Sequence, residues 1–96
     1  MFVYLAMIDS PEDQTKFERV YHKYRYLMLH IAKQILHNHH DAEDAVHQAF
    51  VAIIENIEKI SDVASPKTRS FVVIITERKA IDMLRSNSRR SRSRHC

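Results

Sequence analysis

The chain has 96 residues, with 15 Lys and Arg against 12 Asp and Glu, a formal net charge of +3, no Gly and two Pro. A domain of this length has only a small core, and the missing Gly removes most of the turns that β-hairpins need, so the composition predicts an all-α fold. The missing Gly also excludes glycine-rich phosphate or oxyanion loops, and we expect neither catalytic residues nor enzyme activity.

The first predicted element is a short apolar helix within residues 2–8. It is too short to span a bilayer and has no basic region before it, so we expect neither a membrane association nor a signal peptide. Cys96 is the single cysteine of the chain and cannot form an internal disulfide. Nothing therefore indicates an oxidising compartment, and we expect a cytoplasmic protein.

A long first helix is predicted to begin at Ser10 and Pro11. Ser is a good N-cap, Pro suits the first helical position, and Glu12 and Asp13 add negative charge where the helix dipole favours it. The helical period then continues to Leu36. The apolar residues that keep this period are Phe17, Val20, Tyr21, Tyr24, Leu27, Met28, Ile31, Ile35 and Leu36.

The second helix is predicted to have Asp41 as its N-cap and to run to about Lys59. The short connection before it implies antiparallel packing on the first helix. Its apolar positions recur at a spacing of three and four residues and are Ala42, Ala45, Val46, Ala49, Phe50, Ile53 and Ile57. This pattern leaves an exposed face with Asp44, His47, Gln48 and Val51, a candidate surface for docking a protein.

Residues 60–65 lose the helical period and are predicted to form a loop. Ser65 and Pro66 repeat the start signal and open a third, basic helix. Its run from Phe71 to Ile75 is rich in β-branched residues, but a lone strand would have no partner, so we predict a helix. The residues expected to face inward are Phe71, Ile74, Ile75, Ile81 and Leu84.

We therefore expect a compact three-helix domain in residues 1–90. The segment from Arg85 onward is rich in Ser and Arg and should fray. Residues 91–96 are expected to be a basic disordered tail, or the start of a linker to a second domain that this chain lacks.

Charge is distributed unevenly along the chain. Residues 41–60 contain five acids and one base, whereas residues 67–96 contain nine bases and two acids. The basic segment favours binding to nucleic acid, although a solvated helix face with a flexible tail is the simpler alternative. The acidic residues near the start of the second helix could also serve only to satisfy the helix dipole.

Four of the seven histidines lie close together in the sequence, at positions 37, 39, 40 and 47. They lack the second pair of ligands on another element that zinc sites usually have. We interpret them as solvated turn residues and expect neither a metal nor another cofactor.

Three segments together resemble region 2 of bacterial RNA polymerase sigma factors. They are F-x-x-x-Y-x-x-Y with the helix that follows it (residues 17–36), D-A-E-D-A-V-H-Q-A-F (residues 41–50) and S-F-V-V-I-I-T-E-R-K-A-I-D-M-L-R (residues 70–85). The resemblance covers about residues 12–90 and is greatest with the compact extracytoplasmic-function type of the sigma-70 family. It implies a non-enzymatic domain that initiates transcription.

The resemblance also implies that the acidic helix docks on core RNA polymerase, at the clamp coiled coil of its largest subunit. Asp44, His47, Gln48 and Phe50 stand at the family's docking positions. The family usually has Gln and then Glu where this chain has His47 and Gln48, so one docking charge is absent. An anti-sigma factor is a further partner that the family allows.

The loop and the third helix resemble the part of the family that recognises and melts the promoter minus-ten element. In the family, a base of the non-template strand flips into a pocket formed by this loop and the helix start. The implied DNA-binding residues are Ser61, Asp62, Ser65, Lys67, Arg69, Phe71, Arg78, Lys79, Arg85, Arg89 and Arg90. The family often has Trp in place of Phe71 and Asn in place of Arg78.

Two alternatives come from other functional classes. A small helical adaptor would use the acidic face to bind a protein, and its basic tail would be incidental. A helix-turn-helix protein would bind duplex DNA, but no short helix with a tight turn precedes the basic one.

Asp82 and Arg85 match the family's D-x-x-R and are spaced to pair along the helix. The second promoter-binding domain of the family, region 4, is not in this chain.

Overall fold

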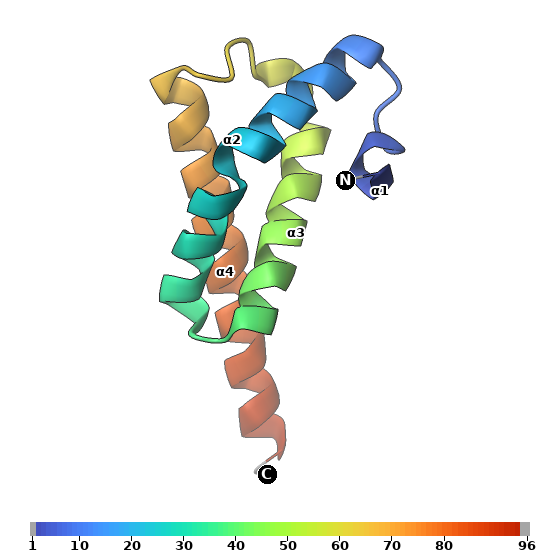
Figure 1. Cartoon of the computed structure of the whole chain (residues 1–96). Coiled ribbons are helices and arrows are strands. Elements are labelled where there is room, and N and C mark those ends of the chain that lie inside the picture. Colours follow the sequence, from blue (N-terminus) through green and yellow to red (C-terminus); the bar gives the residue numbers. More distant parts are fainter. Residues whose placement is uncertain (1, 95–96) are drawn as a thin grey trace.

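The computed structural model describes residues 2–94, with side chains described for residues 3–87. All of its regular elements are helices: α1 (Phe2–Leu5), α2 (Pro11–Leu36), α3 (His39–Glu55), the short 3-10 helix η1 (Ile57–Lys59) and α4 (Pro66–Arg94). The predicted all-α fold is confirmed. Figure 1 shows α2, α3 and α4 packed side by side, with α1 against α3 near the start of the chain.

Helix α2 has the predicted limits. The Ser10 side chain accepts a hydrogen bond from the Asp13 amide at 3.5 Å, and Pro11 occupies the first helical position. At the other end, His37 adopts a left-handed conformation with φ of 56°, and its amide donates to the carbonyl oxygen of Lys33 at 3.0 Å. This turn reverses the chain, so α3 runs antiparallel to α2.

Helix α3 begins three residues earlier and ends earlier than predicted. Its N-cap is Asn38, whose Oδ1 accepts a hydrogen bond from the Asp41 amide at 3.1 Å, so Asp41 lies in the first turn. Asn caps a helix as well as Asp does, and a cap at Asn38 adds two histidines to the helix. The α-helix then stops at Glu55, and residues up to Lys59 form the separate turn η1.

Helix α4 begins as predicted but buries a partly different face. The Ser65 hydroxyl accepts a hydrogen bond from the Thr68 amide at 3.2 Å, which confirms the cap. Val72, Thr76 and Ala80 are fully buried. Of the residues that we expected inside, Phe71 and Ile75 are half-buried against the core, whereas Ile74 is exposed by 50%, Ile81 by 37% and Leu84 by 45%.

The fully buried residues of α4, Val72, Thr76 and Ala80, recur at a spacing of four, and the helix packs on both α2 and α3. The Thr76 hydroxyl donates to the Val72 carbonyl at 2.8 Å, so its burial leaves no donor without a partner. Among the larger apolar residues, Phe71, Ile75 and Met83 pack against the core, whereas Ile74, Ile81 and Leu84 are exposed. The hydrophobic pattern therefore predicted only part of the buried face.

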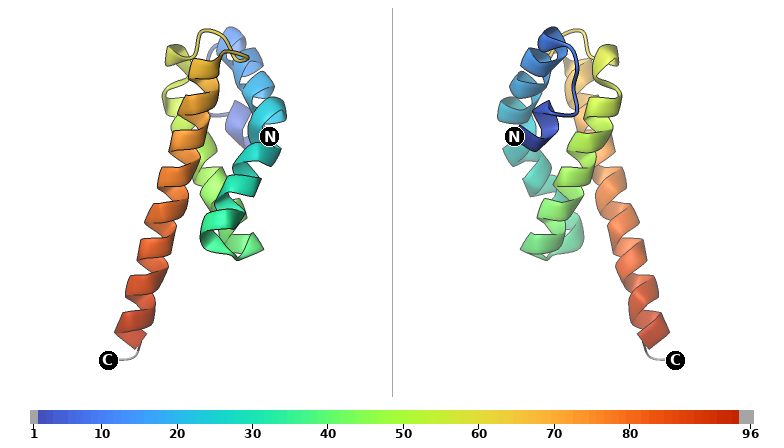
Figure 2. Two further views of the ribbon diagram at one scale, coloured as in Figure 1. Left: turned by 90° about the vertical axis from the view of Figure 1, so that its left-hand side faces the viewer. Right: turned by 90° about the vertical axis from the view of Figure 1, so that its right-hand side faces the viewer.

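The helix also runs further than predicted. The backbone of α4 stays helical to Arg94, through the segment where we expected fraying and a disordered tail. Arg is a good helix former, the segment contains neither Gly nor Pro, and extending an existing helix costs little. Figure 2 shows the end of α4 projecting past the other helices. Residues 95 and 96 lie outside the described part, and a linker role for this segment stays a prediction.

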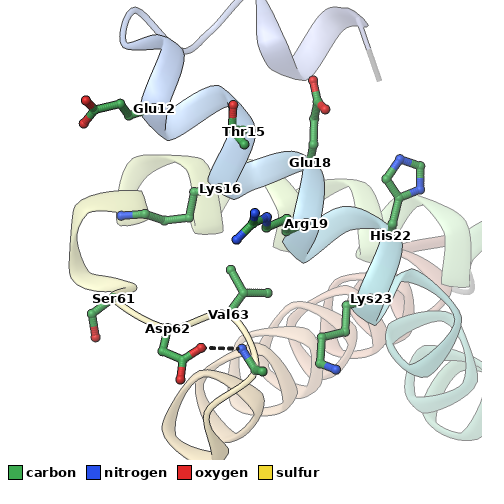
Figure 3. A pocket seen from close by; sticks show the side chains of 11 residues that line it. Glu12, Thr15, Lys16, Glu18, Arg19, His22, Lys23, Ser61, Asp62 and Val63 are labelled. Carbon is green, nitrogen blue, oxygen red and sulfur yellow. Dashed lines mark hydrogen bonds between the residues drawn. The ribbon is translucent and has the colours of Figure 1, made fainter.

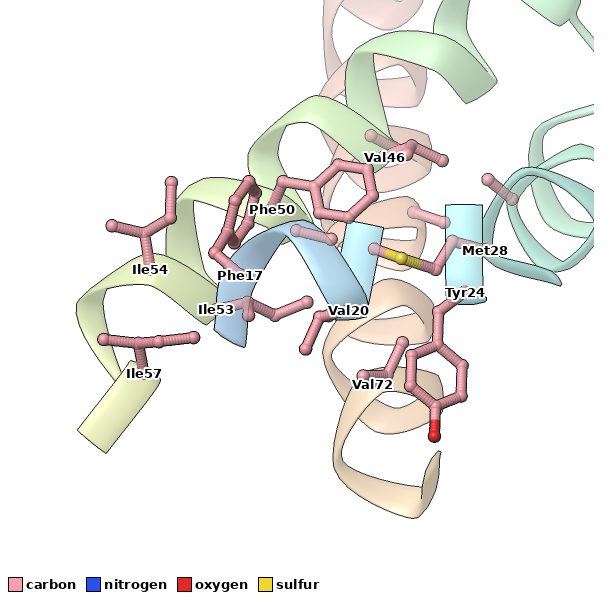
Figure 4. Close-up of a cluster of buried hydrophobic side chains, with 14 of the residues drawn as sticks. Phe17, Val20, Tyr24, Met28, Val46, Phe50, Ile53, Ile54, Ile57 and Val72 are labelled. Carbon is pink, nitrogen blue, oxygen red and sulfur yellow. The ribbon is translucent and has the colours of Figure 1, made fainter. Parts of the chain in front are cut away.

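The core lies where the three long helices meet. Phe17, Val20, Met28, Ile53 and Val72 are almost completely buried, and Figure 4 shows their side chains meeting between α2, α3 and α4. Tyr4 of α1 adds its ring to the edge of this core, 5.5 Å from the rings of both Phe17 and Phe50. Within residues 2–94, no helix combines the length and apolar character needed to cross a bilayer.

Candidate nucleic-acid and protein interfaces

The outer face of α3 presents acidic and polar side chains to solvent. Asp44, His47 and Gln48 are exposed, while Val51 is half-buried. Phe50, which we included among the docking residues, is only 2% exposed and belongs to the core. Its side chain therefore fixes the position of α3 and offers no surface of its own to a partner.

Two of the acids of α3 lie close to histidines of their own helix. His39 lies 3.1 Å from Glu43 and His40 lies 3.6 Å from Asp44, and all four side chains are more than half exposed. Pairs this exposed contribute little to stability and are easily exchanged for a partner's cations. The described hydrogen bond from α4 to this helix comes from an uncharged side chain, since Asn87 donates to Asp41 at 3.1 Å. The acidic face therefore remains free to bind a basic surface.

Helix α1 borders this face. The Tyr4 hydroxyl and the Nδ1 atom of His47 lie 2.6 Å apart, and the two rings are 5.3 Å apart. Burial, and to a lesser extent the neighbouring Tyr21, raises the pKa of the Tyr4 phenol. His47 is thus held by an element that the sequence did not connect with it.

A small hollow of about 260 Å³ lies beside the acidic face, between α1, α2 and α3. Arg25 lies at its wall, with its guanidinium 5.4 Å from the Tyr21 ring and 4.7 Å from the Tyr26 ring. A hydrogen bond with Tyr21 raises the pKa of Arg25. Its Nε atom is buried without a hydrogen-bond partner among the described residues.

The loop between η1 and α4 is held by several hydrogen bonds. The Asp62 carboxylate accepts from the Ala64 amide at 3.0 Å, and the Asp62 carbonyl accepts from the Ser65 hydroxyl at 2.9 Å and the Thr68 hydroxyl at 2.6 Å. From the core side of the loop, the hydroxyl of the buried Tyr24 donates a hydrogen bond to the Val63 carbonyl at 2.6 Å. The candidate DNA-binding loop therefore has a fixed shape before any ligand binds.

Tyr24 also connects this loop to two charged groups. Its pKa is raised chiefly by burial, an effect that the nearby Arg69 opposes and Asp62 reinforces. Arg69 of α4 therefore lies close enough to the Tyr24 phenol to interact with it. The loop, α2 and the first turn of α4 thus meet around one tyrosine.

An open groove of about 1040 Å³ separates this loop from the first half of α2 (Figure 3). The sequence resemblance placed the pocket between the loop and the start of the third helix. This hollow faces α2, and a base pocket between the loop and the start of α4 stays a prediction. The residues that line it are Glu12, Thr15, Lys16, Glu18, Arg19, His22, Lys23, Ser61, Asp62, Val63 and Ala64.

The predicted DNA-binding residues fall into two groups. Ser61, Asp62 and Ser65 lie in the loop, with Lys67, Arg69 and Phe71 just after it. Further along α4, Arg78 and Arg85 are exposed, and Lys79 is half-buried. The side chains of Arg89 and Arg90 lie outside the described part. Phe71 is half-buried against the core, which leaves part of its ring for contact with a base.

Lys67, Arg78 and Arg85 share one face of α4, together with the exposed Ile74 and Ile81, because these positions are separated by three, four or seven residues. Within the described side chains, no ion pair joins Asp82 to Arg85, so the pairing that the D-x-x-R pattern suggested is absent there. Arg85 is therefore available on this outer face.

Among the side chains described for residues 3–87, no three His, Cys, Asp or Glu residues are grouped closely enough to hold a metal ion. The histidines of the α2–α3 turn are instead exposed at the start of α3. The site consists of an acidic face, a basic helix and a loop with a groove. This combination defines a class of small helical binding domains with separate surfaces for a basic partner and a polyanion.

The comparison with protein families identifies which member of this class the chain is. The model for Sigma-70 region 2 matches residues 20–90, so the chain belongs to the sigma-70 region 2 family. Region 2 is the part of sigma factors that binds core RNA polymerase and the promoter −10 element, and it is a transcription initiation domain rather than a known enzyme family. Neither the curated proteins nor the solved structures gave a match.

Proposed function

We propose that this domain belongs to a cytoplasmic sigma factor of the extracytoplasmic-function type. It docks on the clamp coiled coil of the largest polymerase subunit and holds the non-template strand of the minus-ten element. The observation that carries this proposal is the separation of charge: the acids of α3 and the bases of α4 are both exposed, and no described ion pair joins them.

The polymerase contact uses the face of α3 that carries Asp44, His47 and Gln48. A basic coiled coil would replace the exposed His40 as the partner of Asp44, at little cost because that pair is weak. His47 is already oriented by Tyr4 and can contribute a hydrogen bond without having to become ordered. Phe50 supports this face from the core.

The DNA contact uses the loop and the outer face of α4. Lys67, Arg69, Arg78 and Arg85 position the strand through its phosphates, whereas the loop and the exposed part of Phe71 contact an unstacked base. Unstacking costs a few kcal/mol per base. Because its hydrogen bonds already fix the loop, little of the binding energy is spent in ordering it.

Charge reversal at Asp44 tests the docking face. The Asp44→Lys variant should lose at least tenfold in affinity for core polymerase while keeping wild-type helicity, because like charges then oppose each other across the interface. Glu58→Lys is the matched control, since Glu58 is an exposed acid in η1 outside the proposed face. Co-purification with the core subunits measures the capture. Equal capture of both variants would contradict the docking role and favour the adaptor alternative.

A further inference from the structure

The first half of α2 turns a row of cations toward the loop. In Figure 3, Lys16, Arg19 and Lys23 extend on the side of α2 that faces residues 61–63, whereas Glu12 and Glu18 extend away from the loop. Glu12 and Glu18 also line the groove, so α2 gives it three cations and two acids, with the cations on the side nearer the loop.

These three cations differ in their availability. The Lys16 ammonium group donates to the Ile57 carbonyl at 3.3 Å and lies 3.8 Å from the Asp13 carboxylate, so it holds η1 against α2. Arg19 and Lys23 are exposed and have no ion-pair or hydrogen-bond partner within the described residues. They are four residues apart on a helix, which places them roughly 6 Å apart along its axis.

The row of cations continues across the loop. The Lys23 ammonium lies 5.9 Å from the centre of the Tyr24 ring, and Arg69 of α4 is close enough to the Tyr24 phenol to affect its pKa. Tyr24 in turn holds the Val63 carbonyl at 2.6 Å. Tyr24, which holds Val63 of the loop, therefore has Lys23 of α2 as a neighbour, and Arg69 of α4 acts on its phenol.

We propose that α2 forms the second wall of the path for single-stranded DNA, with Arg19 and Lys23 binding the phosphates of a nucleotide that enters the groove beside the loop. This inference rests on the proposed function and extends it to an element outside the loop and α4. The Val63 and Ala64 side chains supply apolar surface for the base, and the two cations neutralise the backbone on either side of it.

The salt dependence of binding distinguishes a phosphate contact from a general loss of charge. Arg19→Ala and Lys23→Ala should each weaken binding of a labelled single-stranded minus-ten oligonucleotide to the complex of the chain with core polymerase. Each should also lower the slope of log affinity against log salt concentration by about 0.7, the value for one phosphate contact on a single strand. Lys33→Ala is the matched control, because Lys33 is an exposed cation in the last turn of the same helix. Its slope should equal that of the wild type.

The two hypotheses fail in different ways. If the wild-type complex does not bind the oligonucleotide at all, the proposed function itself is wrong. If the wild type binds but all three alanine variants share its slope, the proposed function stands and the role of α2 is overturned. A photoreactive side chain at Thr15, an exposed residue of the α2 wall, gives an independent reading. Cross-linking from Thr15 to the oligonucleotide supports the path, and its absence contradicts it.

Discussion

Tyr24 joins the core to the candidate DNA-binding loop. Its side chain is 3% exposed, and its hydroxyl donates a hydrogen bond to the Val63 carbonyl. Tyr24→Phe keeps the ring in the core but leaves that carbonyl without its donor, so we expect a loss of about 1–2 kcal/mol in the free energy of unfolding. Chemical denaturation measures this loss, and wild-type stability would show that water replaces the hydroxyl without penalty.

The pH dependence of the same variant provides a second reading. Burial raises the pKa of Tyr24 above its ordinary value of 10.0, so the folded state holds the phenol proton more tightly than the unfolded state does. The stability linked to this group is intact below the unfolded pKa and is lost as the pH rises through the folded pKa. Tyr24→Phe should therefore lose less stability than the wild type above about pH 10.

Individual caps show what the sequence could predict at this scale. Ser10 and Ser65 were identified correctly, because each is followed by Pro and a helical period begins at once. Asn38 was missed because Asp41, three residues later, is an equally good cap by type. Residue type alone cannot separate two good caps within one turn, and the packing of the following helix decides between them.

In helix α4, the position on the helix decides which of two similar apolar side chains is buried. Val72 is fully buried and Ile74 is 50% exposed, although the two have similar character in the sequence. Val72→Ala should cost about 2 kcal/mol of unfolding free energy, because it leaves a cavity where α4 meets its neighbours. Ile74→Ala should cost less than about 0.5 kcal/mol. Both changes replace a β-branched residue with Ala in one helix, so their effects on helix propensity match.

Thermal or chemical denaturation of these two variants compares the two faces directly. A larger loss for Ile74→Ala than for Val72→Ala would restore the orientation that the sequence pattern predicted. The exposed Ile74 lies near Arg78, on the face of α4 that we propose contacts DNA.

The groove between α2 and the loop could not be predicted from the pattern of either element. Arg19 and Lys23 precede Ser61 and Asp62 by about forty residues, and they line one hollow only because α2 and α4 pack together. By contrast, the acidic face of α3 lies within a single helix, and its exposed residues followed directly from the helical period. A site within one helix can be predicted from the sequence, whereas a site between elements depends on how those elements pack.

At the scale of the whole molecule, the net charge of +3 conceals two separate surfaces. Glu43 and Asp44 of α3 lie close to histidines of their own helix, and the described hydrogen bond between α3 and α4 joins Asp41 to the uncharged Asn87. If the two charged faces had neutralised each other, neither would be available to a partner. Their separation allows polymerase and DNA to be bound at the same time.

Helix α1 is attached to the three-helix domain by few interactions, and it should detach before the domain unfolds. It has only four residues, too few to be stable alone, and it is held by Tyr4 and by the Gln14 amide, which donates to the Leu5 and Ile8 carbonyls at 3.2 and 2.8 Å. We expect the amides of Met7 and Ile8 to exchange hydrogen much faster than those of the core of α2, α3 and α4.

Two variants at Tyr4 separate the contributions of its ring and its hydroxyl to this attachment. Tyr4→Ala removes the ring that packs on Phe17 and Phe50, so the protection of Met7 and Ile8 should vanish while the core helices keep most of theirs. Tyr4→Phe keeps the ring and loses only the hydrogen bond to His47, so most of the protection should remain. The opposite outcome is that, in the wild type, the Met7 and Ile8 amides exchange as slowly as the amides of the core. Helix α1 would then unfold together with the core as one cooperative unit. In that case, the contact between Tyr4 and His47 would break only when the whole domain unfolds. Fast exchange would mean that α1 opens locally, so that a partner of α3 encounters His47 both with and without Tyr4 beside it.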